Sequence, residues 1–405
     1  MLFIHAADIH LDSAAAGATR GEHLPAHITH HCTRRAFNNL VTLAREEDVA
    51  FLVIAGDIFD ADWRDYSTGL YFAQQMQRLG RPCFIVRGNH DAESVITKKL
   101  SLPPNVREFS PRSAHTHLLE DFGVAIHGRS FPNRAVPDDF SDGYPAPVPG
   151  NLNIGVLHTS ADDAGGRHAR YAPCSPGALQ AKGYDYWALG HVHERRTLAR
   201  APWVVFPGNI QGRHPNETGA KGAMLVRFEN GRIVGEPQFR ALDVVRWAAV
   251  EVALDGAEHA GDLHDRACRS LQRAAEDADG RPVIARVTLT GETALHAELL
   301  ADPEAVEAEC RAAALATGAE IYVDAVRVRT GALSLVEGEA LATLRAVFQA
   351  ALDDPAVATE LANDLRALQK LLPPSAETGE LADLRALASD AWQIVSRALA
   401  GAQRA

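Results

Sequence analysis

Residue types that bind metal ions gather at the ends of predicted strands in the first half of the chain. Four apolar residues at 51–54 predict a short buried strand, and Ala55-Gly56 then allows a sharp turn before Asp57. Open α/β sheets bind ligands at the carboxyl ends of their strands, and a carboxylate there can hold a divalent cation. A second carboxylate, Asp60, follows. For this turn taken alone, a helix cap by Asp57 is an equally good interpretation.

Three other predicted strand ends carry the same kinds of side chain. Asp8 and His10 follow the first strand, and residues two apart in an extended chain face the same way. His158 ends a later strand, and His191 and His193 follow an apolar strand and a glycine. Two histidines spaced in this way at the end of a strand indicate a metal site.

The segment RGNHD follows a further buried strand over residues 82–86. Asn89 offers an oxygen ligand to a cation. We expect His90 to act as an acid, and Asp91 to orient its imidazole.

Not every histidine fits this pattern. His5 lies within the apolar run of the first strand, and His127 ends the short strand AIHGRS. We expect both to have structural roles, as buried histidines with hydrogen-bond partners.

The candidate ligands are too many for one ion and suit two. They are Asp8, His10, Asp57, Asn89, His158, His191 and His193. Two cations about 3.5–4 Å apart can bind both sides of a phosphoryl group, provide a hydroxide nucleophile and neutralise developing charge. The pattern predicts hydrolysis of a phosphate ester without a covalent intermediate. Asp57 would bridge the ions, and His90 would protonate the leaving oxygen.

The composition limits the class of protein. With 46% hydrophobic and 23% charged residues it is typical of a soluble globular protein. No apolar run approaches the roughly 20 residues of a membrane span, and the amino terminus lacks the basic segment of a signal peptide. The five scattered cysteines indicate reduced thiols, so we expect a cytoplasmic protein. The net charge of -12 argues against nonspecific coating of nucleic acid but does not exclude a nuclease.

The pattern of predicted elements divides the chain into three regions. Residues 1–242 carry all the candidate ligands, and residues 243–330 alternate strands with alanine-rich helices, which predicts a small α+β domain. Residues 331–405 are predicted to be helical, with three apolar stripes and a break at Pro373-Pro374. These stripes either pack on the second domain or dock a coiled-coil partner.

The chain resembles the calcineurin-like metallophosphoesterases in its series of motifs, which are, in order, D-x-H, GD-x-x-D, GNHD, H and GH-x-H. They extend from Asp8 to His193. Within that superfamily the chain is most similar to the SbcD/YhaO-type DNA repair exonucleases, the nuclease subunits of SbcCD-like complexes. The segments that carry this similarity are HAADIHLDS, GDIFDADWRDYSTGL, YPAPVPGNLNIGVLHTS, YDYWALGHVHER and FPGNIQGRH.

The resemblance implies a fold, a ligand set and partners. The fold would be α/β, a four-layer αββα sandwich followed by a capping domain. One ion would be held by Asp8, His10, Asp57 and His193, and the other by Asp57, Asn89, His158 and His191. Both would be Mn²⁺, the family's usual activating ion. The carboxyl-terminal helices would bind an SMC-like ATPase of the SbcC or YhaN type. The resemblance also allows a homodimer.

One position departs from part of the family. Some members carry a histidine where this chain has Asp60, so no role carries over to Asp60. The Ala61-Asp62 that follows replaces the Arg-Gly of the superfamily's protein phosphatases, which counts against a phosphoprotein substrate.

The sequence therefore favours a two-metal phosphodiesterase that acts on DNA. We expect 3′-to-5′ exonuclease activity on duplex ends, with endonuclease activity on single strands or hairpins left open. Two alternatives remain. One is a phosphoesterase for a small phosphodiester or nucleotide, and the other is a mainly architectural subunit that binds DNA ends.

Overall fold

The computed structural model contains two compact units. It describes residues 1–13, 24–25, 28, 31–60, 65–93, 101–161, 171–332, 339–369, 387–388, 391–392 and 394–395. The first unit comprises residues 1–249 and 275–284, and the second comprises residues 250–274 and 285–405. The domain boundaries expected from the sequence stay a prediction.

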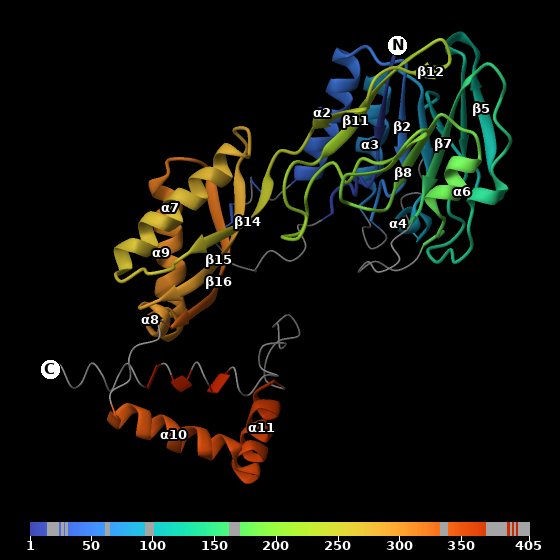
Figure 1. Ribbon diagram of the computed structural model, residues 1–405. Helices are drawn as coiled ribbons and strands as arrows, with labels where there is room; N and C mark the ends of the chain where they lie inside the picture. Colours follow the sequence, from blue (N-terminus) through green and yellow to red (C-terminus); the bar gives the residue numbers. More distant parts are fainter. Residues whose placement is uncertain are drawn as a thin grey trace. The chain divides into compact units, whose positions relative to one another are not determined.

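Two sheets form the centre of the first unit (Figure 1). In the first sheet, β1 to β4 are parallel neighbours, β11 pairs antiparallel with β1, and β12 and β13 pair antiparallel with β11. Its strands are β1 (Leu2–Ala6), β2 (Phe51–Ala55), β3 (Cys83–Val86), β4 (Val106–Glu108), β11 (Gly222–Glu229), β12 (Arg232–Ile233) and β13 (Gln238–Ala241). Because β2 is central and covered on both faces, all five of its residues are buried and apolar.

The second sheet has the order β5-β6-β7-β8-β10-β9. The four strands β6, β7, β8 and β10 are parallel, and the edge strands β5 and β9 are antiparallel to their neighbours. Its strands are β5 (His115–Leu119), β6 (Val124–Gly128), β7 (Leu152–His158), β8 (Tyr186–Gly190), β9 (Arg196–Arg200) and β10 (Trp203–Phe206). The sequence did not indicate β9 or β13, which are short and contain few buried residues.

The two sheets face each other and bury a common apolar core. Phe3, Phe51 and Phe84 of the first sheet pack in one cluster with Ile154 and Tyr186 of the second. The Phe3 and Phe51 rings stack at a centroid distance of 5.0 Å, and Tyr186 meets Phe3 edge-on. The predicted sandwich is therefore confirmed.

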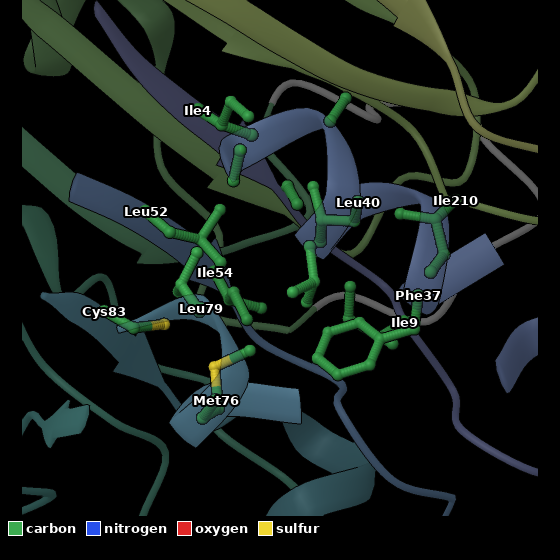
Figure 2. Packing of buried hydrophobic residues seen from close by; sticks show 14 of the residues in the cluster. Ile4, Ile9, Phe37, Leu40, Leu52, Ile54, Met76, Leu79, Cys83 and Ile210 are labelled. Carbon is green, nitrogen blue, oxygen red and sulfur yellow. The ribbon is translucent and has the colours of Figure 1, made fainter. Parts of the chain in front are cut away.

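Helices cover the outer face of the first sheet (Figure 2). They are α2 (Cys32–Glu46) and α3 (Tyr66–Leu79). The stripe predicted for α2 is buried, and its Phe37 and Leu40 pack with Leu52 of β2 and Met76 of α3. Asp65 caps α3 by accepting a hydrogen bond from the Ser67 N–H, and Gly80 ends this helix with a left-handed φ of 64°.

The outer face of the second sheet is covered mainly by loops. The short helix α6 (Pro176–Ala181) and residues of the segment 131–150 pack on Trp187 and Leu189 of β8. The remaining short elements of this unit are α4 (Asn89–Glu93) and the 3-10 turns η1 (Glu120–Phe122) and η2 (Ser141–Gly143).

A three-stranded sheet with the order β14-β15-β16 follows. Its strands are β14 (Arg246–Ala253), β15 (Val283–Thr293) and β16 (Ile321–Ala332). They alternate along the chain with α7 (Ala260–Glu276), α8 (His296–Ala301) and α9 (Pro303–Ala316). The α+β pattern read from the sequence is present, with α8 as an addition.

Among the described residues after 332, the structure has the helices α10 (Glu339–Asp353) and α11 (Pro355–Gln369). Phe348 of α10 contacts the ring of Trp392 at a centroid distance of 5.4 Å. The third predicted stripe, over residues 384–399, lies mostly outside the described residues. Within the part of the chain that the structure describes, no helix is both long and apolar enough to cross a membrane.

Gly155 of β7 provides a test of the packing between the sheet strands. A Cβ at this residue would lie 2.4 Å from the indole of Trp187. We expect Gly155→Ala to lower the free energy of unfolding by about 1–3 kcal/mol because the indole must move. Urea denaturation followed by tryptophan fluorescence measures this change.

The matched control is Gly143→Ala, whose added Cβ would meet no atom within 4 Å. We expect it to change the free energy of unfolding by less than about 0.5 kcal/mol. Equal denaturation midpoints for the two variants would contradict this account of the Gly155–Trp187 contact.

Candidate metal centre

The predicted ligands meet because parallel strands end at the same edge of each sheet. In the first sheet the ends of β1, β2 and β3 are adjacent, with Ala6 paired to Ile54 and Ala55 paired to Val86. In the second sheet β7 and β8 end together, with His158 paired to Gly190. The two edges belong to one sandwich, so five strand ends deliver side chains to one place.

The backbone after β1 and β2 is held in an unusual conformation. Asp8, His10 and Asp57 have positive φ values of 51°, 45° and 53°. The extended chain predicted at Asp8 and His10 is therefore wrong. The Asp8 N–H donates to the Gly56 carbonyl and the His10 N–H to the Asp57 carbonyl, so the two loops continue to pair beyond the strands. Left-handed residues other than glycine are costly and cluster at functional sites.

Asp8, His10 and His193 form the first ligand cluster. One nitrogen or oxygen of each lies within 4.8 Å of the others. The His10 Nδ1–H donates to Asp60 at 2.7 Å, and the His193 Nδ1–H donates to Glu217 at 2.7 Å. A carboxylate only accepts, so each Nε2 keeps its lone pair.

Asp57, His158 and His191 form the second cluster, again with ligand atoms within 4.8 Å of one another. The His158 Nδ1–H donates to the Ala55 carbonyl at 2.9 Å. The Nε2 atom then carries no proton, and its lone pair is available to a metal ion. That Nε2 lies 3.0 Å from Asn89 Oδ1 and 3.5 Å from Asp57 Oδ2. The predicted ligand Asn89 is thus beside this cluster.

These contacts fit bound cations. The Nε2 atoms of His10 and His193 face each other at 3.3 Å, although neither carries a proton in the tautomers that their carboxylates impose. The His158 Nε2 likewise faces only acceptor oxygens. Acceptors that converge on a point repel one another unless a positive charge lies between them. The mixture of carboxylate oxygen and imidazole nitrogen suits a first-row divalent metal.

Asp57 lies between the clusters. Its Oδ2 is 3.9 Å from the His10 Nε2 and 3.5 Å from the His158 Nε2. Its Oδ1 accepts a hydrogen bond from the His90 N–H at 3.0 Å. One carboxylate oxygen therefore lies within reach of both clusters, and the role of Asp57 as a bridge between two ions stays a prediction.

Burial keeps two of the histidine ligands in the neutral state that metals require. It lowers the pKa of His158 to about 3, and together with the Arg213 charge it lowers the pKa of His10 to about 3. Both imidazoles are therefore neutral near pH 7. Burial and the charge of Asp57 raise the pKa of Asp8 well above its usual value. A divalent cation would offset this repulsion between the carboxylates.

His90 is oriented by Asp60, whereas the sequence argument assigned that role to Asp91. The Asp60 Oδ1 lies 3.3 Å from the His90 Nδ1. Asp91 instead accepts backbone N–H bonds from Ile58 and Phe59 at 2.9 Å and from Gly88 at 3.1 Å. Asp91 therefore fixes the loop that carries Asp57, and its direct contact with the chemistry stays a prediction. Burial, reinforced by the Asp57 charge, raises the pKa of Asp91 to about 7.

Two glycines leave room for the ligands. A Cβ at Gly88 would lie 2.2 Å from Asp57 Oδ1, and one at Gly56, whose φ is 94°, would lie 2.4 Å from His158 Nδ1. The small residues in the AGD and GNHD motifs are therefore required by the packing of the ligands themselves.

A supporting group of side chains from the segment 207–221 was not predicted from the sequence. Glu217 orients His193, Lys221 Nζ donates to the His193 carbonyl at 2.9 Å, and Asn209 Nδ2 donates to Glu217 at 2.9 Å. Arg213 Nη1 donates to Asp60 at 3.2 Å. The segment FPGNIQGRH contributed to the family resemblance, but no local pattern linked it to His193.

The two structural histidines are confirmed. His5 is buried, with Nδ1 3.0 Å from the Tyr186 hydroxyl and Nε2 3.1 Å from the Leu189 carbonyl. His127 is buried between Thr116 and Asn153 at 2.8 and 3.1 Å. Neither side chain belongs to the ligand clusters.

Comparisons with known proteins agree with this geometry. Residues 1–195 match the calcineurin-like phosphoesterase family, and residues 247–331 match the middle domain of metallophosphoesterase YhaO. The chain is 34% identical over 301 residues to the uncharacterized metallophosphoesterase YhaO of Bacillus subtilis, covering 72% of each protein. It is 26% identical over 326 residues to the DNA double-strand break repair protein Mre11 of Methanopyrus kandleri, covering 70% of this chain and 66% of that protein.

Among solved structures, a dimetal phosphatase from Danio rerio is similar with a TM-score of 0.37 and 12% identity. The match covers 58% of this chain and 95% of the phosphatase.

Glu217 provides a test of the first cluster. Replacing it with glutamine removes the charge that orients His193, so we expect Glu217→Gln to weaken one of two Mn²⁺ sites by about 10-fold. Isothermal titration of the metal-free protein with Mn²⁺ measures both affinities.

The matched control is Glu236→Gln, which changes an exposed carboxylate that pairs with Arg200. We expect it to retain both affinities. Unchanged binding by Glu217→Gln would show that Glu217 does not support the site.

Proposed function

We propose that this chain, which belongs to the calcineurin-like metallophosphoesterases, is a two-metal phosphodiesterase whose substrate is DNA. As a member of that family it is a hydrolase. The observation that carries the proposal is the position of Asp57 Oδ2 between two clusters of imidazoles and carboxylates. We propose Mn²⁺ as the ion, because the ligands mix oxygen and imidazole nitrogen.

In this proposal the seven predicted ligands hold the ions as two sets that share Asp57. The ions supply binding of the phosphate oxygens, activation of water and neutralisation of developing charge. Asp8, His10, Asp57 and His193 would hold one ion, and Asp57, Asn89, His158 and His191 the other. The protein contributes fixed ligand directions, since the histidine Nδ1 atoms of His10, His158 and His193 are all hydrogen-bonded.

His90 would protonate the leaving oxygen. Burial by itself would lower the pKa of His90. The hydrogen bond to Asp60 and the negative charges of Asp57 and Asp60 have the larger combined effect, so the pKa of His90 is raised above its usual value. The imidazole is partly exposed beside the ligand clusters, within reach of a bound ester. A protonated imidazole held by a carboxylate is a suitable general acid for an alkoxide leaving group.

Similarity to relatives supports DNA as the substrate. The chain matches a protein named for DNA double-strand break repair, and it carries a YhaO-type middle domain after the phosphoesterase domain. We propose 3′-to-5′ exonuclease activity on duplex ends, and we include endonuclease activity on single strands or hairpins. The biological role would be DNA repair.

An SMC-like ATPase of the SbcC or YhaN type is the proposed partner. Exposed apolar side chains on α10 and α11 support this proposal, because such residues are suited to contact another helix. They are Leu344, Val347 and Leu361.

A comparison of leaving groups tests the role of His90. We expect His90→Ala to lower Mn²⁺-dependent cleavage of end-labelled duplex DNA by about 10²- to 10⁴-fold. Hydrolysis of bis-p-nitrophenyl phosphate should fall much less, because p-nitrophenolate leaves as a stable anion without a proton. Removal of metal with EDTA should abolish both activities of the wild type.

The control variant is His259→Ala, which replaces an exposed histidine directly before α7. Its activity on both substrates should equal that of the wild type. Equal losses on both substrates would show that His90 does not act as the acid. Wild-type protein that cleaves the small diester but no DNA would point to a small-phosphodiester enzyme. Metal-bound protein that cleaves neither would point to an architectural subunit.

A further inference from the structure

We propose that the β14 start, residues 244–247, positions the metal ligand His193, because it holds in place the loop that orients the His193 imidazole. Two side chains make this connection, Gln211 from the loop and Trp247 from the strand. Both are positioning residues, which act on the ion through Glu217. The inference rests on the metal centre of the proposed function and deepens it, since it identifies a segment outside the ligand-bearing strands on which one ion site depends.

The loop of residues 209–219 sets the direction of the Glu217 carboxylate. Glu217 Oε1 accepts the His193 Nδ1–H at 2.7 Å. Its Oε2 accepts hydrogen bonds from the Asn209 side chain at 2.9 Å and from the Arg213 backbone N–H at 2.7 Å. A shift of this loop would therefore move the carboxylate and with it the hydrogen bond that orients His193.

The Gln211 side chain bonds this loop to the β14 start. Gln211 is only 1% exposed. Its Oε1 accepts the Val244 N–H at 2.9 Å, and its Nε2 donates to the Val245 carbonyl at 2.8 Å. The backbone carbonyl of Gln211 accepts a hydrogen bond at 2.8 Å from the same Asn209 amide that bonds Glu217. Because both ends of the buried Gln211 amide are bonded, this contact fixes the spacing between the loop and the β14 start.

Trp247 makes a second contact with the same loop from the strand. Its carbonyl accepts the Gly219 N–H at 3.1 Å, and the residue is 2% exposed. A Cβ added at Gly212 would lie 3.2 Å from the Trp247 indole and 2.8 Å from the Glu217 carbonyl oxygen. The Gly212 backbone is thus packed closely against both, and the indole lies against the turn that carries Glu217.

The β14 start is itself fixed by a buried group of charges. The side chain of Asp243 is fully buried and pairs with Arg246 at 2.9 Å and with Arg281 at 3.2 Å. Arg246 Nη1 also donates to the Asp277 carbonyl at 2.6 Å. Two arginines around one buried carboxylate hold the backbone rigidly, because separating such a pair leaves an uncompensated buried charge.

These contacts all lie within the first unit, which includes residues 1–249 and 275–284. The strand β14 continues beyond residue 249 into the second unit, where it pairs with β15. One ligand of the first cluster is therefore supported by the strand that connects the two units.

A purely structural role for these contacts would lower stability and leave metal binding unchanged, and one experiment separates the two roles. Mn²⁺ is titrated calorimetrically into the metal-free full chain of the wild type, Gln211→Met and Trp247→Phe. Methionine keeps the length of Gln211 but cannot bond the backbone in the same way. The control is Asn153→Leu, which removes a buried amide that bonds the Val148 backbone, at the opposite end of β7 from His158.

We expect Gln211→Met and Trp247→Phe each to weaken one of the two Mn²⁺ sites by about 3- to 10-fold and to retain the other. Asn153→Leu should also be less stable in urea denaturation, but it should retain both affinities. In the Glu217→Gln background, Gln211→Met should weaken the site little further, because both changes act on the same hydrogen bond to His193.

Wild-type affinities in either folded variant would overturn the inference, and so would a weakening by Gln211→Met that is fully retained in Glu217→Gln protein. If one variant does not fold, the other decides by the same criteria. Wild-type protein that binds fewer than two Mn²⁺ ions would instead refute the two-metal centre of the proposed function, and the inference with it.

Discussion

The backbone pairing between the loops after β1 and β2 is the interaction on which the site depends. The hydrogen bonds Asp8 N–H to Gly56 carbonyl and His10 N–H to Asp57 carbonyl hold these two loops at strand spacing after both strands have ended. The left-handed φ values of Asp8, His10 and Asp57 are the local cost of this arrangement. Aspartate and histidine tolerate that region better than most residues, so the residue types that bind metal are also among those that this backbone accepts.

The clusters would be unfavourable without positive charge. Asp8 and Asp57 repel each other in a buried environment, and the lone pairs of His10 and His193 converge. Groups of this kind are stable in a protein interior only when they are paired or bind cations. The same features that would destabilise the clusters without a cation therefore favour the binding of divalent metals.

Support for the ligands comes from residues that are not themselves ligands. Asp91 fixes the loop of Asp57 through three backbone N–H groups, Asp60 contacts both His10 and His90, and Glu217 orients His193. Arg213 connects two of these carboxylates, since its side chain bonds Asp60 and its backbone bonds Glu217. His90 and the first cluster are consequently coupled through one continuous hydrogen-bonded group.

The sequence by itself determined most of the strands and the candidate ligands, because each candidate lies at the end of the strand that delivers it or shortly after that end. Short-range pattern was sufficient to identify the buried strand before Asp57 and the stripe of α2, and the family resemblance implied the α/β sandwich. Only the tertiary structure decided which carboxylate orients each histidine. Asp60 contacts a histidine 50 residues before it, and Glu217 one 24 residues before it. Such pairs depend on the direction of a side chain and on the close approach of distant segments, and the adjacency of His90 and Asp91 in the sequence specified neither.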